Sequence, residues 1–318
     1  MYPTSEEGRA TKGRDSFERP HLSPSKFEGV FFMLKKYLVL LPTVALIAGL
    51  ANVAPQAQAT STPHRIVSLS PSATEDLFAI GAGSQVIAVD QLSNFPTSAP
   101  VSKLDAFTPN VEAIAAYKPD LVVLNSGATK AQSIKVALNK LKIKVYFETA
   151  PDDINGAYKE ISDLGSLTGK GTAAKGLIRS MKASIKKSIT AAKRKSSLSF
   201  YHELDDTLYS VTSETFIGKV YKDFNLTNIA DAAAKADSYG YPQLTPEYVV
   251  QSNPALIFLS DAQYGTTGAS VAARPGWSNL KAVTSNRVIP LPEDIPSRWG
   301  PRLVDFYQFV STSIQNVN

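Results

Sequence analysis

Two stretches of the chain share one arrangement of polar and apolar positions. Each has a Thr-Pro pair, a glutamate shortly after it, a second proline at the same distance beyond the glutamate, and then an unbroken apolar run. The threonine is predicted to cap a helix and the first proline to open it. The helix should end before the second proline, and the apolar run predicts a strand buried on both faces. The copies, at residues 108–124 and 245–259, predict two similar α/β lobes.

The first half of the chain predicts further strands and helices around the first copy. Residues 65–77 indicate a strand, a polar turn and a helix that starts near Ser72. Ser70 and Ser72 would then lie at the carboxyl end of the strand, where open α/β sheets bind ligands. The alternative is that both serines only cap the helix. We also expect strands at 86–89 and 144–147, a polar loop at 90–100, and a helix at 130–141.

Residues 154–195 are helical in pattern, with an interruption at 168–171, and provide the best candidate for a connecting helix. Its lysines are better explained by a solvated face than by an anionic partner. After it we expect strands at 198–201, 208–211 and 287–290, a loop at 202–207, a helix at 216–224 and a closing helix from Pro301.

The N-terminal region predicts an export signal. The basic pair Lys35-Lys36 precedes an apolar run, and small residues end at Ala59, which predicts a signal peptide at 33–59 that is cleaved after Ala59. Residues 1–32 would be a disordered or mis-annotated extension, with Met33 rather than Met1 as the true start. An uncleaved anchor is the alternative, but the run is shorter than the roughly 20 residues that a spanning helix needs.

Composition excludes several kinds of site. The chain has 33 basic and 28 acidic residues, and because 7 and 5 of these precede Thr60, the mature part carries a net charge of only +3. Such a mild charge does not indicate nucleic acid. The absence of cysteine excludes disulfides, thiolate metal sites and a lipid anchor on a cysteine. We therefore expect an exported protein that is not a lipoprotein, located in a periplasm or at the outer face of the membrane.

Several short motifs, in order, resemble the substrate-binding proteins of cobalamin, iron-siderophore and haem ABC importers. The resemblance extends from Arg65 to the C-terminus. The order and spacing of the motifs are stronger evidence for it than any single motif. The motifs are Ser70-Pro71-Ser72, Asn110-Val111-Glu112, Lys118-Pro119-Asp120, Asn228-Ile229, Thr245-Pro246-Glu247 and Arg298-Trp299-Gly300-Pro301-Arg302.

The resemblance implies an α/β fold of two Rossmann-like lobes joined by one long α-helix, with a ligand cleft between the lobes. The expected parts are residues 60–153, 154–195 and 196–318. It also implies that Glu112 and Glu247 dock into arginine pockets of a dimeric ABC permease, which works with its ATPase. The alternative is that each glutamate only complements a helix dipole. A single helical connector should permit only a small closure, and we expect a monomer.

The resemblance further implies a bound ligand, which would be cobalamin, a ferric siderophore or haem, and no intrinsic cofactor. Aromatic rings and a fixed cation in the cleft would suit a large flat ligand. Trp277 is an aromatic for which core packing is an equal alternative. The expected ligand-binding residues are Ser70, Ser72, Phe95, Phe107, Ser126, Glu203, Tyr239, Tyr241, Tyr264, Asp294, Arg298 and Trp299.

Other classes of function remain as alternatives. A zinc or manganese carrier would need several imidazoles, and the mature part from Thr60 has only His64 and His202. A haem carrier could use His202 or a cleft tyrosine as the axial ligand. An extracytoplasmic hydrolase or metal-dependent enzyme would have to centre on His202 and Glu203, since no nucleophile elbow or dinucleotide motif is present. A ligand sensor without a transport role is the third possibility.

Overall fold

The computed structural model describes residues 62–193, 196–292, 294–315 and 317. The predicted signal peptide and the extension before it lie outside these residues. These described residues belong to one compact unit. Among the residues that are described, none of the helices has the length and apolar character needed to cross a membrane.

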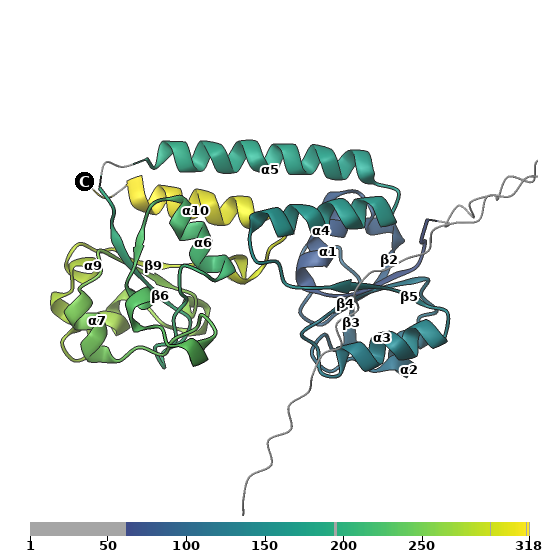
Figure 1. The fold of residues 1–318 in the computed structure, drawn as a ribbon, viewed down its shortest axis with the longest axis horizontal. Coiled ribbons are helices and arrows are strands. Elements are labelled where there is room, and N and C mark those ends of the chain that lie inside the picture. Colours follow the sequence, from purple (N-terminus) through teal and green to yellow (C-terminus); the bar gives the residue numbers. More distant parts are fainter. Residues whose placement is uncertain (1–61, 194–195, 293, 316, 318) are drawn as a thin grey trace, which may run out of the picture. The chain divides into compact units, whose positions relative to one another are not determined.

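The first lobe is built on a parallel sheet of five strands in the order β3-β2-β1-β4-β5 (Figure 1). Its order reverses between β1 and its neighbours β2 and β4, which makes the carboxyl end of β1 a topological switch point. The strands are β1 (Ile66–Leu69), β2 (Val86–Asp90), β3 (Val101–Leu104), β4 (Leu121–Asn125) and β5 (Lys144–Glu148).

Helices cover both faces of this sheet. Leu121 and Val123 pack in one core cluster with α1 and α4, whereas Val122 and Leu124 pack in another with α2 and α3, as the period of two along a strand requires. The helices are α1 (Pro71–Ala79), α2 (Val111–Ala116), α3 (Ala131–Lys140) and α4 (Ile154–Leu167).

The second lobe has a parallel sheet in the order β7-β6-β8-β9. Its strands are β6 (Ser199–Glu203), β7 (Thr227–Asn228), β8 (Leu256–Leu259) and β9 (Val288–Pro290), and its helices are α6 (Phe216–Asp223), α7 (Pro246–Ser252), α8 (Gly268–Ala272) and α9 (Lys281–Thr284). The fold is therefore α/β with two lobes, as the sequence predicts.

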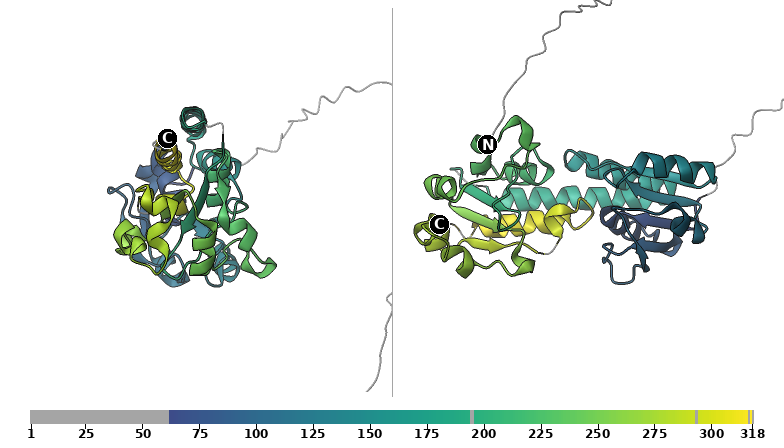
Figure 2. Two further views of the ribbon diagram at one scale, coloured as in Figure 1. Left: turned by 90° about the vertical axis from the view of Figure 1, so that its left-hand side faces the viewer. Right: turned by 90° about the horizontal axis from the view of Figure 1, so that it is seen from below.

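The segment between the two sheets is two helices, not one. Helix α4 ends at Leu167 and packs on α1, so it belongs with the first sheet. Helix α5 (Gly171–Ala191) is the long connector, and α10 (Leu303–Gln315) lies beside it in Figures 1 and 2. One continuous core cluster takes in residues of α5, α10 and both sheets, such as Ile66 and Phe200.

One strand is unexpected, and two expected elements differ in detail from the structure. The sequence pattern does not predict strand β3, because this edge strand is largely exposed and lacks an apolar run. Residues 208–211 do not join the sheet; they pair with 240–243 through an isolated bridge between Tyr209 and Gln243 and neighbouring backbone bonds. The expected loop at 202–207 begins later, because His202 and Glu203 are buried within β6.

The two copies of the repeat also differ in how their helices begin. Thr245 caps α7 as predicted, and Pro246 is its first residue. In the first copy Asn110, not Thr108, is the cap of α2, because the Thr108 hydroxyl and amide instead bond the side chain of Asp105. Each glutamate consequently occupies the second position of its helix.

Candidate functional site

A cavity of about 450 Å³ lies at the switch point of the first sheet and is closed by residues of the second lobe. The first lobe contributes loops that follow β1, β2, β3 and β4, at the edge where parallel α/β sheets bind ligands. Its lining residues are Leu69, Ser70, Pro71, Ser72, Gln91, Leu92, Asn94, Ala106, Phe107, Asn125, Tyr264, Asp294, Ser297, Arg298 and Trp299.

Seven of the twelve expected ligand residues line this cavity: Ser70, Ser72, Phe107, Tyr264, Asp294, Arg298 and Trp299. Phe107 of the first lobe and Tyr264 of the second are the most accessible of its aromatic rings, with 63% and 84% of their surfaces exposed. Two aromatic faces from opposite lobes can therefore contact one ligand.

The five remaining expected residues do not line the cavity. The Phe95 ring packs against the guanidinium of Arg302, 4.3 Å from its centre, while the amide of Ser126 bonds the backbone of β5. Tyr239 is 88% exposed and Tyr241 also lies at the surface. Glu203 is fully buried, as described below, so its carboxylate cannot reach a ligand in this cavity.

The cavity also contains polar residues outside the expected set of ligand residues. Asn125 ends β4, where the rule that ligands lie at the carboxyl ends of parallel strands predicts a loop that faces the cleft. Gln91 and Asn94 follow β2, and the same rule could have identified them because the loop at 90–100 is predicted to be polar. Ser297 has no comparable signal, since it belongs to a loop of the second half.

Residues 294–302, between β9 and α10, cross from the second lobe and bind the first. The guanidinium of Arg298 donates to Glu75 at 3.2 Å, to Asn94 at 2.9 Å and to Asp294 at 2.6 Å. Arg302 donates to the same Glu75 at 2.9 and 2.5 Å. Since the Glu75 side chain is only 1% exposed, this buried ion-pair network fixes the segment on α1.

The network leaves the cavity without an unpaired charge on any described lining residue. Asp294 and Arg298 are the charged residues in that lining, and they neutralise each other. Arg298 is only 7% exposed, and its donors are taken by protein acceptors. The expectation that Arg298 is a cation available to the ligand is therefore wrong, because its guanidinium is committed to the protein.

The two expected serines are also occupied. The Ser70 hydroxyl donates to Glu148 at 2.8 Å, and its oxygen accepts from the amide of Ala73 as the cap of α1. The hydroxyl oxygen of Ser72 accepts from the backbone amide of Trp299 at 3.3 Å. Both serines therefore shape the wall of the cavity, and the helix-cap alternative holds for Ser70.

His202 and Glu203 do not form an accessible catalytic pair. The two ring nitrogens of His202 lie 2.9 Å from the hydroxyls of Tyr221 and Ser260, and burial lowers its pKa to about 3. Glu203 is bound by Arg274 through two bonds of 2.6 and 2.7 Å. Because both side chains are fully buried, His202 cannot serve as an axial ligand in the cavity either.

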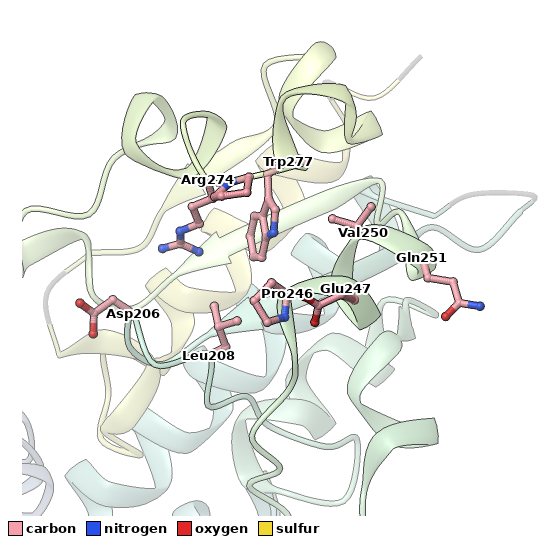
Figure 3. A pocket seen from close by; sticks show the side chains of 10 residues that line it. Asp206, Leu208, Pro246, Glu247, Val250, Gln251, Arg274 and Trp277 are labelled. Atoms are coloured by element: carbon pink, nitrogen blue, oxygen red, sulfur yellow. The ribbon is translucent and has the colours of Figure 1, made fainter.

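A second cavity, of about 650 Å³, lies on the second lobe beside Glu247 (Figure 3). Its walls are largely apolar, and in the figure the side chain of Trp277 points towards Pro246. Trp277 is completely buried in the core of this lobe, with Arg274 stacked 4.7 Å from its ring centre. Trp277 therefore packs the core and does not reach the cavity between the lobes.

The two glutamates at helix starts are exposed and available. Glu112 and Glu247 both lie at the surface, and neither has an ion-pair partner among the residues described. At the second position of a helix, a carboxylate is stabilised in its ionised form by the helix dipole. Each lobe thus presents one unpaired carboxylate at an equivalent place in its fold.

The sequence of this chain is similar to those of known proteins. The family model described as periplasmic binding protein matches residues 66–295. The uncharacterized ABC transporter substrate-binding lipoprotein YvrC of Bacillus subtilis is 31% identical, over 79% of this chain and 80% of its own length. A cobalamin-binding protein of Halobacterium salinarum is 27% identical, over 77% of this chain and 68% of its own.

Solved structures share the fold. The periplasmic vitamin B12 binding protein BtuF of Vibrio cholerae superposes with a TM-score of 0.65 at 21% identity, covering 80% of this chain and 97% of that one. The periplasmic haem binding protein HutB of Vibrio cholerae gives 0.70 at 18% identity, with 78% and 97% covered. At these identities the likeness concerns the two-lobed fold and not the ligand.

Proposed function

The chain belongs to the periplasmic binding protein family, and on this premise we propose that it captures a cobalamin-type corrinoid and delivers it to an ABC import permease. Members of this family are substrate-binding transport proteins that act outside the cytoplasm, not enzymes. The burial of His202 and Glu203 agrees with that assignment.

The observation that supports a corrinoid is the charge balance of the cavity between the lobes. Haem carries propionates and many ferric siderophores are anionic, so a site for either gains from an unpaired cation. In the described lining of the cavity, the cation is Arg298, and it is already paired with Asp294 and Glu75. Phe107 and Tyr264 provide exposed aromatic faces for a large ring system, and Gln91 and Asn125 provide neutral hydrogen-bonding groups.

Calorimetric titration with cyanocobalamin, haemin and an anionic ferric catecholate siderophore tests the choice of ligand. We expect saturable one-to-one binding of cyanocobalamin and much weaker binding of the other two. Tight binding of haemin with no response to cyanocobalamin would show that the charge argument is wrong, and Tyr264 would then be the candidate axial ligand in the cavity.

Delivery to the permease is proposed to use Glu112 and Glu247. An exposed, unpaired carboxylate on each lobe suits the two equivalent arginine clusters of a two-fold permease, and such pairs set orientation and association rate. The apolar cavity in Figure 3, which Glu247 helps to line, would lie next to one of the two docking residues.

The double variant Glu112→Ala with Glu247→Ala should keep its affinity for cyanocobalamin and lose uptake through the partner permease. A matched control is Glu214→Ala, because Glu214 is an exposed glutamate that makes only a surface pair with Lys222. Unchanged uptake in the double variant would refute this docking geometry. Ligand binding without any uptake activity in the parent protein would favour a sensor.

We further propose that the signal peptide at 33–59 directs export, that residues 60–318 form the mature monomer, and that its lobes are 60–153 and 196–318. The relative YvrC is named a lipoprotein, whereas the present sequence has no cysteine that could carry a lipid. N-terminal sequencing of the exported protein checks cleavage after Ala59.

A further inference from the structure

Three carboxyl groups are buried together behind the wall of the cavity between the lobes. Asp76 belongs to α1, Glu148 ends β5 and Glu160 belongs to α4. Their exposed fractions are 0%, 1% and 5%. Three ionised carboxylates in such a place would repel one another and would each lose hydration, so the cluster requires protons.

Hydrogen bonds connect this cluster to two residues that line the cavity. The Ser70 hydroxyl donates to Glu148 Oε1 at 2.8 Å, and the indole Nε1–H of Trp299 donates to Glu160 Oε2 at 2.8 Å. Both Ser70 and Trp299 belong to the cavity lining. The cluster therefore holds one side chain from the first lobe and one from the crossing segment 294–302.

The carboxyl oxygens of the cluster that have no hydrogen-bond partner indicate which groups need a proton. Glu148 Oε2 and Glu160 Oε1 have no hydrogen-bond partner among the described residues, and each of the two carboxyls influences the pKa of the other, so they are close neighbours. A proton carried by Glu160 and donated to Glu148 satisfies both. Asp76 is fully buried with neither carboxyl oxygen bonded in the part described, which is tolerable only for a protonated acid.

The surrounding charges favour the protonated state. Burial, followed by the charges of Glu148 and Asp76, raises the pKa of Glu160 to about 11. Burial also raises the pKa values of Asp76 and Glu148. The neighbouring titratable groups are Glu75 on α1, Asp90 on β2, Tyr146 on β5 and Asp163 on α4. The nearby cations Arg298 and Arg302 are already bound to Glu75.

We propose that Glu160 is a positioning residue for ligand binding: as a neutral acid shared with Glu148 and Asp76, it fixes the indole of Trp299 in the cavity wall. Ionisation of this acid places a charge among two other carboxyls, which must then admit water. Although the carboxylate by itself accepts from the indole N–H more strongly than the neutral acid, the entering water displaces the Glu160 side chain, so the Trp299 ring loses its fixed position and the wall that it forms loosens. The relevance to ligand rests on the proposed function, but the positioning itself is tested without any ligand.

Intrinsic fluorescence provides that test because the chain has only two tryptophans. In a Trp277→Phe background Trp299 is the sole emitter, and its emission is followed with iodide quenching from about pH 6 to about pH 11. We expect a shift to longer wavelength and greater quenching as the acid ionises. With Glu160→Gln added, the amide still accepts from the indole and cannot ionise, so this transition should vanish.

Two results would overturn the proposal. One is the same transition in the Trp277→Phe/Glu160→Gln protein, which shares every tyrosine with its parent and so controls for their titration. The other is the same emission and iodide quenching at neutral pH in the Trp277→Phe/Glu160→Leu protein, which lacks the acceptor of Trp299, as in the Trp277→Phe protein, with folding of both checked by circular dichroism.

Binding of cyanocobalamin adds a readout that separates positioning from folding. Glu160→Leu removes the acceptor of Trp299 and should weaken affinity by about threefold to tenfold, as the loss of one buried hydrogen bond implies. Glu160→Gln should restore the parent affinity, and equal loss in both variants would contradict the proposal. If the parent does not bind cyanocobalamin, the proposed ligand fails while the fluorescence result still decides the role of Glu160.

Discussion

Replacement of Glu160 by glutamine should make the protein more stable at neutral pH. Glutamine has almost the same shape, can accept from the Trp299 indole and can donate to Glu148, so the hydrogen bonds of the carboxyl cluster are retained. What changes is the cost of keeping an acid protonated. The folded protein keeps the Glu160 proton to about pH 11, whereas the unfolded chain releases it near the ordinary glutamate pKa of 4.5.

The sign and size follow from linkage. Below pH 4.5 the Glu160 carboxyl is protonated in both the folded and the unfolded state, so it does not make stability depend on pH. Because its pKa is higher in the folded state, the free energy of unfolding then falls steadily as pH rises from 4.5 towards the folded pKa. Each pH unit in that interval lowers the free energy of unfolding by about 1.4 kcal/mol per group. At pH 7 the native protein has therefore lost about 3 kcal/mol, which Glu160→Gln should recover in large part.

Urea denaturation of the parent and variant at about pH 4 and pH 7 measures this difference. We expect nearly equal stability at the lower pH and a gain for the variant at the higher one. Glu214→Gln, at an exposed glutamate, should show no such dependence. If Glu160→Gln destabilised the protein equally at both pH values, Glu160 would be ionised in the native state and the reasoning would be refuted.

Three further changes probe other parts of the structure. Because burial lowers the pKa of His202 to about 3 from 6.5, stability should fall by about 1.4 kcal/mol per unit as pH drops below 6.5, and His202→Gln should flatten this slope in acid denaturation curves. Glu203→Ala should cost about 3–5 kcal/mol in chemical denaturation, because Arg274 loses its buried partner. Phe107→Ala and Tyr264→Ala should each weaken cyanocobalamin affinity in calorimetry by more than tenfold if stacking contributes about 1.5 kcal/mol or more. Full affinity in both variants would exclude an aromatic clamp.

The sequence predicts the parts of this fold that depend on local periodicity. The apolar runs of β4 and β8 are buried on both faces, and the proline after each short helix marks its end. The rule for the carboxyl ends of parallel strands correctly brings residues after β1 and β4 to one cavity. These features succeed because neighbouring residues in the sequence determine them.

The local sequence pattern does not predict burial correctly where residues distant in the sequence form hydrogen bonds or ion pairs with a polar side chain. His202 and Glu203 resemble a loop in sequence, yet Tyr221, Ser260 and Arg274 make their burial in β6 possible. The edge strand β3 fails for the opposite reason, since it has little apolar surface to bury. Arg298 reads as a free cation because its partner Glu75 lies 223 positions away in the sequence.

The partners of Arg298 also bear on how far the lobes can move. The single long connector α5 is predicted to permit only a small closure, and two further contacts act in the same direction, since α10 packs along α5 and residues 294–302 bind α1. Large opening would have to separate Arg298 and Arg302 from the buried Glu75, and would leave that carboxylate without its partners. Separation would also remove the indole of Trp299 from Glu160. The contacts that hold the crossing segment therefore favour small adjustments of the cavity wall over a wide hinge motion.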